Sequence, residues 1–361
     1  MINYLLMLAL LIWPFGQLLN LQLPGQTMVI YPLDLICILL TLSLLVTKPR
    51  RLQVIRDPLS QPLALFLFFA ALSLLFNLQF AASGGLVVAV SYLLRLFIYP
   101  SVYFAVKLSS PRQVLLTVLF SLGFFSVLGL LQYLIFPDMR FLKNLGFDDH
   151  YFRLIGTFYD PNFAGAIFAA TALVFLSLSQ WPVAVTLVLL LALTFSRASY
   201  LVFILGTIYI FLAQKRRALL WVLILLGGII IFIPKPFGEG VNLWRTFSIF
   251  SRFDSWQTGL NLFLQKPFFG WGYNTLRGLT GQRFQIDSSL LYLGATTGIF
   301  GTLAFIGFLK AALRQINFLP QKIFILALLI HSLFNNSLFY IWLYFAFWLV
   351  LGLPTKEYTK S

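Results

Sequence analysis

The sequence predicts an all-α fold: a polytopic membrane helix bundle of about 12 transmembrane helices, with a large external loop between the ninth and the tenth. Composition and residue pattern predict it. Of the 361 residues, 60% are hydrophobic and only 10% are charged, and the mean hydropathy is +0.92. Soluble chains carry about 25% charged residues, so this chain has too little polar surface to face water. Its apolar runs are continuous rather than alternating, which favours helices over a transmembrane barrel.

Division of the sequence into its apolar runs predicts the helices in chain order. The first run has no basic segment before it and no small-residue cleavage site after it, which predicts a retained span rather than a signal peptide. We expect residues 1–361 to form a single integral membrane domain. The expected helices are 3–20, 33–47, 60–78, 84–106, 113–136, 162–178, 181–195, 198–213, 218–234, 288–309, 322–337 and 339–353.

The distribution of Lys and Arg predicts the orientation of these helices. The loops on one side carry fourteen basic residues and two acidic residues, in segments 48–57, 107–112, 215–217, 310–322 and 356–360. This side is expected to be cytoplasmic, with both termini in the cytoplasm. The bias accounts for most of the net charge of +15, so we expect no nucleic-acid partner.

Cysteine and histidine are too scarce for a metal or disulfide framework. Cys37 is the single cysteine and lies in an apolar run, and the chain has only His150 and His331. We therefore expect no metal site and no cofactor. A phosphate-binding loop of the G-x-x-x-x-G-K-[ST] type is also absent from the sequence, which argues against an ATP-driven pump.

Polar sequence outside the expected helices concentrates in two external segments, 137–161 and 235–287. The second is rich in Trp and Phe, so we expect an external amphipathic loop that folds back onto the membrane surface. Arg252 and Trp256 are four residues apart and would share one helical face. An interfacial helix followed by a Pro/Gly turn would account for most of this loop, but it does not require Arg252 or Arg245.

Four external arginines, Arg153, Arg197, Arg245 and Arg252, suggest an anionic ligand. Guanidinium groups bind phosphate through two parallel hydrogen bonds and stay charged, so converging arginines suit a diphosphate. Simpler explanations remain open. Arg197 could snorkel to lipid headgroups, although the small residues and hydroxyls of Ser196-Arg197-Ala-Ser199 would let a bulky anion approach.

Two external aspartates also allow two interpretations. Asp160 precedes Pro161 and is well placed to cap the helix that Pro161 opens. Asp287 precedes the tenth helix and could cap it in the same way, or could act as a base at the mouth of a cavity.

Arg95 falls inside the fourth expected helix, where an arginine is costly and needs a polar partner. The candidates are an ion pair with Asp34 at the start of the second helix, or the diphosphate of a substrate in a deep cavity. His331, near Asn335 and Asn336, is expected to satisfy a helix contact.

Four motifs in order give the chain a family resemblance. They are the stretch from Arg153 to Asn162, the turn Ser196-Arg197, Arg252 with Trp256 followed by Lys266-Pro-Phe-Phe-Gly-Trp-Gly272, and the Leu-x-x-x-x-Gly-x-x-Gly pattern from Leu293 to Gly301. Over residues 150–305 the chain resembles the O-antigen ligase and O-antigen polymerase superfamily.

The resemblance implies a metal-independent membrane glycosyltransferase that moves a glycan from a polyprenyl diphosphate to an acceptor hydroxyl at the periplasmic face. The donor would be the polyprenyl-diphosphate-linked glycan, and the acceptor a glycan, lipid or protein. By position, Arg197 and Arg252 would hold the diphosphate, with Arg153 and Arg245 as further candidates. Ligases of this family place a histidine where this chain has Asp287 as the candidate base, so the polymerase-like members fit better.

The resemblance predicts that Arg197→Ala and Arg252→Ala abolish transfer without lowering membrane abundance. A transporter of lipid-linked glycans or polysaccharide could use the same basic cavity, and it remains the main alternative. It would have to present its site to both sides of the bilayer, whereas the polar loops here lie on one side. A structural membrane protein would tolerate loss of both arginines.

Overall fold

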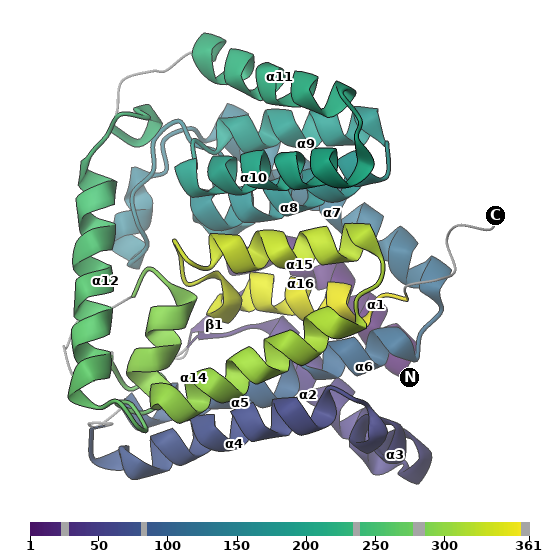
Figure 1. Cartoon of the computed structure of the whole chain (residues 1–361), viewed down its shortest axis with the longest axis vertical. Coiled ribbons are helices and arrows are strands. Elements are labelled where there is room, and N and C mark those ends of the chain that lie inside the picture. The colour runs from purple at the N-terminus through teal and green to yellow at the C-terminus, as the bar shows by residue number, and fades with distance from the viewer. Residues whose placement is uncertain (23–28, 81–84, 234–238, 277–285, 355–361) are drawn as a thin grey trace.

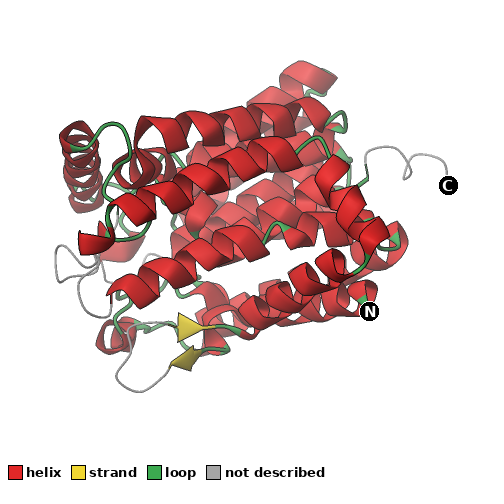
Figure 2. Ribbon diagram, turned by 90° about the horizontal axis from the view of Figure 1, so that it is seen from below, coloured by secondary structure: helices red, strands yellow, loops and turns green. Residues whose placement is uncertain are grey.

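The computed structural model describes residues 1–22, 29–80, 85–233, 239–276 and 286–354. These residues form an all-α protein with one small antiparallel hairpin, in which β1 (Leu21–Gln22) pairs with β2 (Val29–Ile30). The helices run side by side in layers (Figures 1 and 2). The all-α part of the predicted fold class is confirmed.

Each of the twelve expected ranges contains a helix. Those of the first half are α1 (Ile2–Ile12), α2 (Pro32–Val46), α4 (Ser60–Phe76), α5 (Gly85–Ile98), α6 (Ser101–Lys107), α7 (Pro111–Ile135) and α8 (Pro161–Ser177). Those of the second half are α9 (Trp181–Leu193), α10 (Arg197–Gln214), α11 (Ala218–Phe232), α14 (Ser289–Gln315), α15 (Leu319–His331) and α16 (Ile341–Gly352). Two further helices, α3 (Lys48–Arg56) and α12 (Phe247–Gln265), lie between them.

Proline at the start of a helix marks several of these boundaries. Pro32, Pro111 and Pro161 each occupy the first helical position, where the missing N–H costs nothing. The expected helix 322–337 is too long, because α15 ends at His331 and a turn leads to the short 3₁₀ helix Ser337–Phe339. The expected helix 84–106 is divided into α5 and α6.

The surface of the bundle is apolar. On α7, Phe120, Leu134 and Ile135 are each about 60% exposed or more, and many other large hydrophobic side chains face outward in the same way. Among the described helices, four are long and apolar enough to cross a membrane: Gly85–Lys107, Pro111–Ile135, Arg197–Gln214 and Ser289–Gln315. A bent pair, α2 with α3, would make five. Twelve spans remain a prediction.

The helices of the bundle are stacked in three parts, with α12 at one end of them. In Figure 1, α8 to α11 form the upper part of the bundle, α15 and α16 lie in the middle, and α14, α4 and α5 lie below. The helix α12 runs across the ends of the others, and it is seen end-on in Figure 2. The N-terminus lies at the opposite end of the bundle. The loop before the tenth expected helix therefore contains a helix, α12, and its place at the membrane surface stays a prediction.

The segment after α12 locks into a break in α14. Gly298 has φ +66°, and a Cβ there would lie 2.2 Å from the carbonyl oxygen of Phe268. Backbone hydrogen bonds join Trp271 to Ala295, Gly272 to Thr296 and Ile299 to Pro267. The glycines of two of the sequence motifs therefore serve close backbone packing.

Candidate active site

Arg252 lies in the second turn of α12, on the side that faces the turn after α15. Its Nη2 donates to Asn335 Oδ1 at 3.5 Å. Burial lowers the pKa of Arg252, while the carboxylates of Asp287 and Asp160 oppose that shift. Both carboxylates therefore lie close enough to attract the guanidinium, although neither is within the 4.0 Å of an ion pair.

Arg197, at the first position of α10, holds the segment that leads into α12. Its Nη1 donates to the carbonyl oxygens of Leu243 at 3.1 Å and Arg245 at 2.8 Å, and its Nη2 donates to Ser248 Oγ. Both terminal nitrogens of the guanidinium therefore donate hydrogen bonds within the protein. Arg197 thus also has a structural role that its motif does not reveal.

Arg153 and Arg245 meet on one backbone oxygen. The Phe195 carbonyl accepts from Arg153 Nη2 at 3.3 Å and from Arg245 Nη2 at 3.2 Å, and Arg153 Nε also donates to the Thr194 carbonyl at 2.9 Å. Phe195 itself has φ +50°, which side-chain-bearing residues rarely adopt. Burial, followed by the neighbouring Arg245, lowers the pKa of Arg153 to about 9.

Burial and the charges of Arg197 and Arg252 likewise lower the pKa of Arg245 to about 10. The four arginines therefore repel one another across a partly buried region. The ion pairs among the described residues are Arg95–Asp34, Lys107–Asp57 and Arg140–Asp138, and none of them involves this group. The geometry of guanidinium groups matches that of phosphate and carboxylate anions.

Asp287 faces this cluster from the start of α14. Its backbone is fixed by α12, since Trp256 Nε1 donates to the Asp287 carbonyl at 2.9 Å and the Asp287 N–H donates to Ser255 Oγ at 2.8 Å. Burial raises the pKa of its carboxyl to about 6, against the opposing effect of Arg252. A carboxylate with such a pKa can accept a proton near neutral pH.

The interpretation of Asp287 as the cap of α14 is wrong. Ser288 occupies that position, with its Oγ accepting from the Leu291 N–H. No residue that the structure describes donates a hydrogen bond to the Asp287 carboxylate. The side chain is therefore left for another role.

Asp160, in contrast, caps α8 as predicted. Its Oδ1 accepts from the N–H groups of Asn162 at 2.6 Å and Phe163 at 3.4 Å. Burial raises the pKa of Asp160, and the charge of Arg153 opposes this shift. The charge of Asp160 therefore acts on Arg252, while the hydrogen bonds of its carboxylate go to the first N–H groups of α8.

A polar network behind Arg252 was missed by the sequence analysis. His331 is fully buried, with Nε2 3.2 Å from Ser199 Oγ and Nδ1 2.6 Å from Ser337 Oγ. Ser199 Oγ lies 2.9 Å from Ser196 Oγ, which donates to Asn162 Oδ1 at 3.0 Å. The hydroxyls of the serines that flank Arg197 thus bind residues of α8 and α15.

The same network reaches Arg252. Asn335 Nδ2 is 3.5 Å from His331 Nε2, and its Oδ1 accepts from Arg252. The i, i+4 spacing of His331 and Asn335 is a weak signal in the sequence, but nothing in it connects these residues with Ser199, 132 positions earlier. His331 does satisfy helix contacts, as predicted, and it also supports the site.

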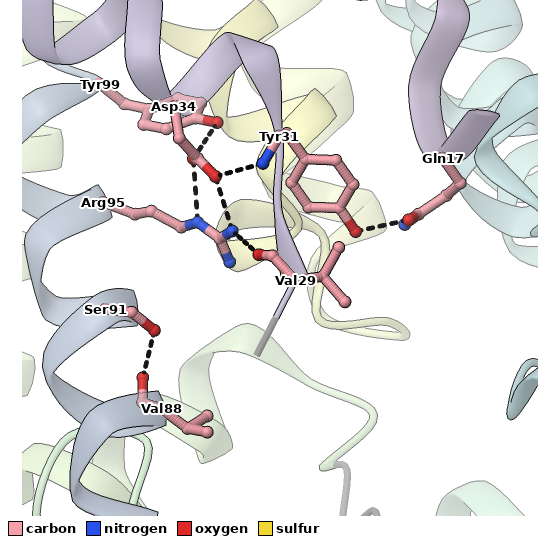
Figure 3. A network of polar contacts seen from close by, with 8 residues as sticks. All are labelled: Gln17, Val29, Tyr31, Asp34, Val88, Ser91, Arg95 and Tyr99. Carbon is pink, nitrogen blue, oxygen red and sulfur yellow. Dashed lines mark hydrogen bonds and ion pairs between the residues drawn. The ribbon is translucent and has the colours of Figure 1, made fainter. Parts of the chain in front are cut away.

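Arg95 belongs to a separate buried network (Figure 3). Its Nε and Nη2 bind the two carboxylate oxygens of Asp34 at 3.0 and 2.7 Å, and Nη2 also donates to the Val29 carbonyl. Tyr99 OH and the Tyr31 N–H complete the carboxylate shell. The predicted ion pair with Asp34 is confirmed, and this arginine is occupied by the fold.

We compared the sequence with models of known protein families and with curated proteins. Residues 182–306 match a family model described as O-antigen ligase. Over these residues the chain is similar to the O-antigen ligase family. No curated protein matches the chain.

The O-antigen ligase segment runs from α9 into α14. It therefore includes Arg197, Arg245, Arg252 and Asp287. Arg153 lies before it, and His331 and Asn335 lie after it. The match together with the apolar helices indicates a multi-pass membrane protein with a glycosyltransferase-like function in polysaccharide synthesis.

No group of three or more His, Cys, Asp or Glu side chains that could hold a metal ion occurs in the part of the chain that the structure describes. The positive charge of Arg252 acts on the candidate base Asp287 and opposes the rise of its pKa.

Proposed function

We propose that this chain is a metal-independent glycosyltransferase of the bacterial inner membrane. It would transfer or polymerise a polyprenyl-diphosphate-linked glycan onto an acceptor hydroxyl at the periplasmic face during surface polysaccharide synthesis. The observation that carries the proposal is the cluster of Arg153, Arg197, Arg245 and Arg252, none of which forms an ion pair with a described residue. Beside it lies Asp287, whose carboxylate accepts no hydrogen bond from a described residue.

The reaction is an inverting displacement at the anomeric carbon of the donor sugar. The acceptor oxygen forms the new C–O bond while the bond from the sugar to the diphosphate breaks, and the electron pair leaves with the diphosphate. Asp287 takes the proton from the acceptor hydroxyl. Arg252 and Arg197 stabilise the negative charge that grows on the leaving diphosphate, which is where preorganised positive charge contributes most.

Among the arginines, Arg252 is the best candidate for direct contact with the diphosphate. Its one hydrogen bond to a described residue is long, at 3.5 Å, whereas Arg153, Arg197 and Arg245 are each bound to backbone carbonyls. Bound guanidiniums still contribute positive potential. We therefore assign binding and leaving-group stabilisation to Arg252 first, with Arg197 next to it.

We favour a polymerase over a ligase because the candidate base is Asp287, where the resemblance places a histidine in ligases. The acceptor would then be a second lipid-linked glycan. The arrangement proposed for the chain in the membrane is twelve spans with both termini in the cytoplasm, so that α12 and the site lie at the periplasmic surface. The end of the bundle that α12 crosses, opposite the N-terminus, suits this arrangement.

The test is a transfer assay with purified full-length protein in liposomes and radiolabelled polyprenyl-diphosphate oligosaccharide, alone and with a panel of acceptors. A ladder of products supports the polymerase, and one shifted band with a single acceptor supports the ligase. Activity that persists in EDTA supports metal independence. Labelled donor that crosses the bilayer without any covalent product would replace the enzyme with the transporter.

A further inference from the structure

The short helix α3 lies at the end of the bundle opposite α12, on the lower right of Figure 1. Its axis is bent by 102° from that of α2, after a break at Thr47. It has no buried residue, and Ile55 is 63% exposed. A helix that turns across the bundle end with an exposed apolar side chain has the form of an interfacial helix.

Four of the nine residues of α3 are basic, and none is acidic. Lys48, Arg51 and Arg56 are exposed. Within the described chain, the guanidinium groups of Arg51 and Arg56 make no hydrogen bond or ion pair. Arg50 differs, because its Nη1 donates to the Ser43 carbonyl at 3.4 Å. Two guanidinium groups on this helix are therefore available to an external anion.

A cavity of about 640 Å³ opens between α3 and the end of α6. Arg56, Gln53 and Lys107 give it polar edges, while Leu52 and Leu108 are among its apolar lining residues. Lys107 is paired with Asp57 at 2.6 Å, and Tyr103 OH also donates to that carboxylate. Within the described chain, Arg56 is thus a cation on the cavity lining without a hydrogen bond or ion pair, and apolar side chains such as Leu52 and Leu108 lie on the same lining.

This combination fits an amphiphile with a negative head and an apolar tail. We propose that the cavity between α3 and α6 binds one anionic phospholipid, with the phosphate at Arg56 and an acyl chain along Leu52 and Leu108. Arg51 lies outside the cavity lining on the same helix and adds positive charge that attracts the headgroup. The argument for this occupant is charge complementarity, since anionic headgroups attract basic residues near a membrane surface. The site is separate from the arginine cluster at the opposite end of the bundle and does not depend on the proposed enzymatic function.

The test is native mass spectrometry of the full-length protein released from micelles that contain phosphatidylglycerol or phosphatidylcholine. The wild-type chain should retain one phosphatidylglycerol and little phosphatidylcholine. Arg51→Gln and Arg56→Gln should each lower retention about fivefold, from the contribution of one basic residue near an anionic surface. Leu108→Trp should also lower retention, because it fills the cavity without changing any charge.

The matched control is Lys310→Gln with Arg314→Gln, two exposed cations on α14 that do not line the cavity. Retention should be unchanged in this variant. If the control lost as much phosphatidylglycerol as the α3 variants, or if Leu108→Trp lost none, retention would depend on general surface charge rather than on this cavity. Either result would overturn the proposal. Competition by inorganic phosphate at equal affinity would overturn the lipid as the occupant in favour of free phosphate.

Discussion

Asn335 Oδ1 lies 3.5 Å from Nη2 of Arg252, a contact that joins the turn after α15 to α12. Asn335 in turn lies beside His331, whose ring binds Ser199 of α10. The position of Arg252 is therefore supported by α15 with the turn that follows it, and through them by α10. Such support is what a preorganised charge requires.

Replacement of Arg252 tests its proposed role most directly. Arg252→Ala should lower the rate of glycan transfer by about 100-fold or more, by analogy with the loss of one preorganised donor at a developing charge. Arg252→Lys should recover only part of this rate, because an ammonium keeps the charge but not the two parallel donors. Arg140→Ala, which removes an exposed arginine paired with Asp138, is the control and should leave transfer unchanged.

Asp287 predicts a pH dependence. A carboxylate must be ionised to accept a proton, so transfer should decline as the pH is lowered through about 6. Asp287→Asn should remove most of the activity, and the remainder should no longer change at this pH. Asp254→Asn, at an exposed position of α12, is the control. An unchanged pH profile in Asp287→Asn would assign the base elsewhere.

The same residue predicts a stability effect of opposite sign. Burial raises its folded-state pKa above the unfolded value of about 3.9, so the folded chain binds more protons between about pH 4 and 6. The contribution of Asp287 to the free energy of unfolding should therefore decrease as the pH rises through this interval. Thermal unfolding of Asp287→Asn should lack this component, and its melting temperature at pH 7 should exceed that of the wild type.

Arg197 has both a proposed chemical role and an observed structural one. Arg197→Ala should abolish transfer and should also loosen the chain before α12, since three hydrogen bonds to residues 243–248 are lost. Hydrogen exchange in that segment should become faster. Ser248→Ala removes one of the three partners and should have a smaller effect on exchange with most of the transfer retained. Loss of transfer in Ser248→Ala as severe as in Arg197→Ala would reduce Arg197 to a structural residue.

The buried pair of Arg95 and Asp34 predicts a strong coupling. Arg95→Met or Asp34→Leu alone leaves one uncompensated buried charge, at a cost of about 3–5 kcal/mol, and should lower membrane abundance. The double variant should recover abundance, because neither charge remains. A double variant no more abundant than the worse single one would contradict this prediction. The exposed Arg140–Asp138 pair should show no such coupling.

Two glycines of α14 provide a comparison within one helix. Gly298→Ala should prevent folding, because its φ is +66° and a Cβ would clash with the backbone of Phe268. Gly307→Ala meets nothing within 4 Å and should be neutral or slightly stabilising. Membrane abundance of the two variants gives the comparison. Equal abundance would mean that the segment after α12 does not lock into α14.

The sequence predicts the helices well because each is a continuous apolar run, and it predicts the partner of Arg95 because a buried arginine requires a nearby carboxylate. It cannot decide between Asp287 and Ser288 as the cap of α14, since both side chains can accept the same N–H bond. The break at Gly298 leaves the apolar pattern intact and so gives no signal. The contact of His331 with Ser199 is set by tertiary packing, which local patterns do not encode.

The arginine cluster also affects the energy of the empty protein. Four like charges held together without paired carboxylates among the described residues store electrostatic repulsion that the rest of the fold must offset. An anion that enters removes this repulsion at the same time as it forms its own contacts. Under the proposed function, binding of the diphosphate should therefore raise the thermal stability of the protein, and the protein without its ligand should be the less stable form.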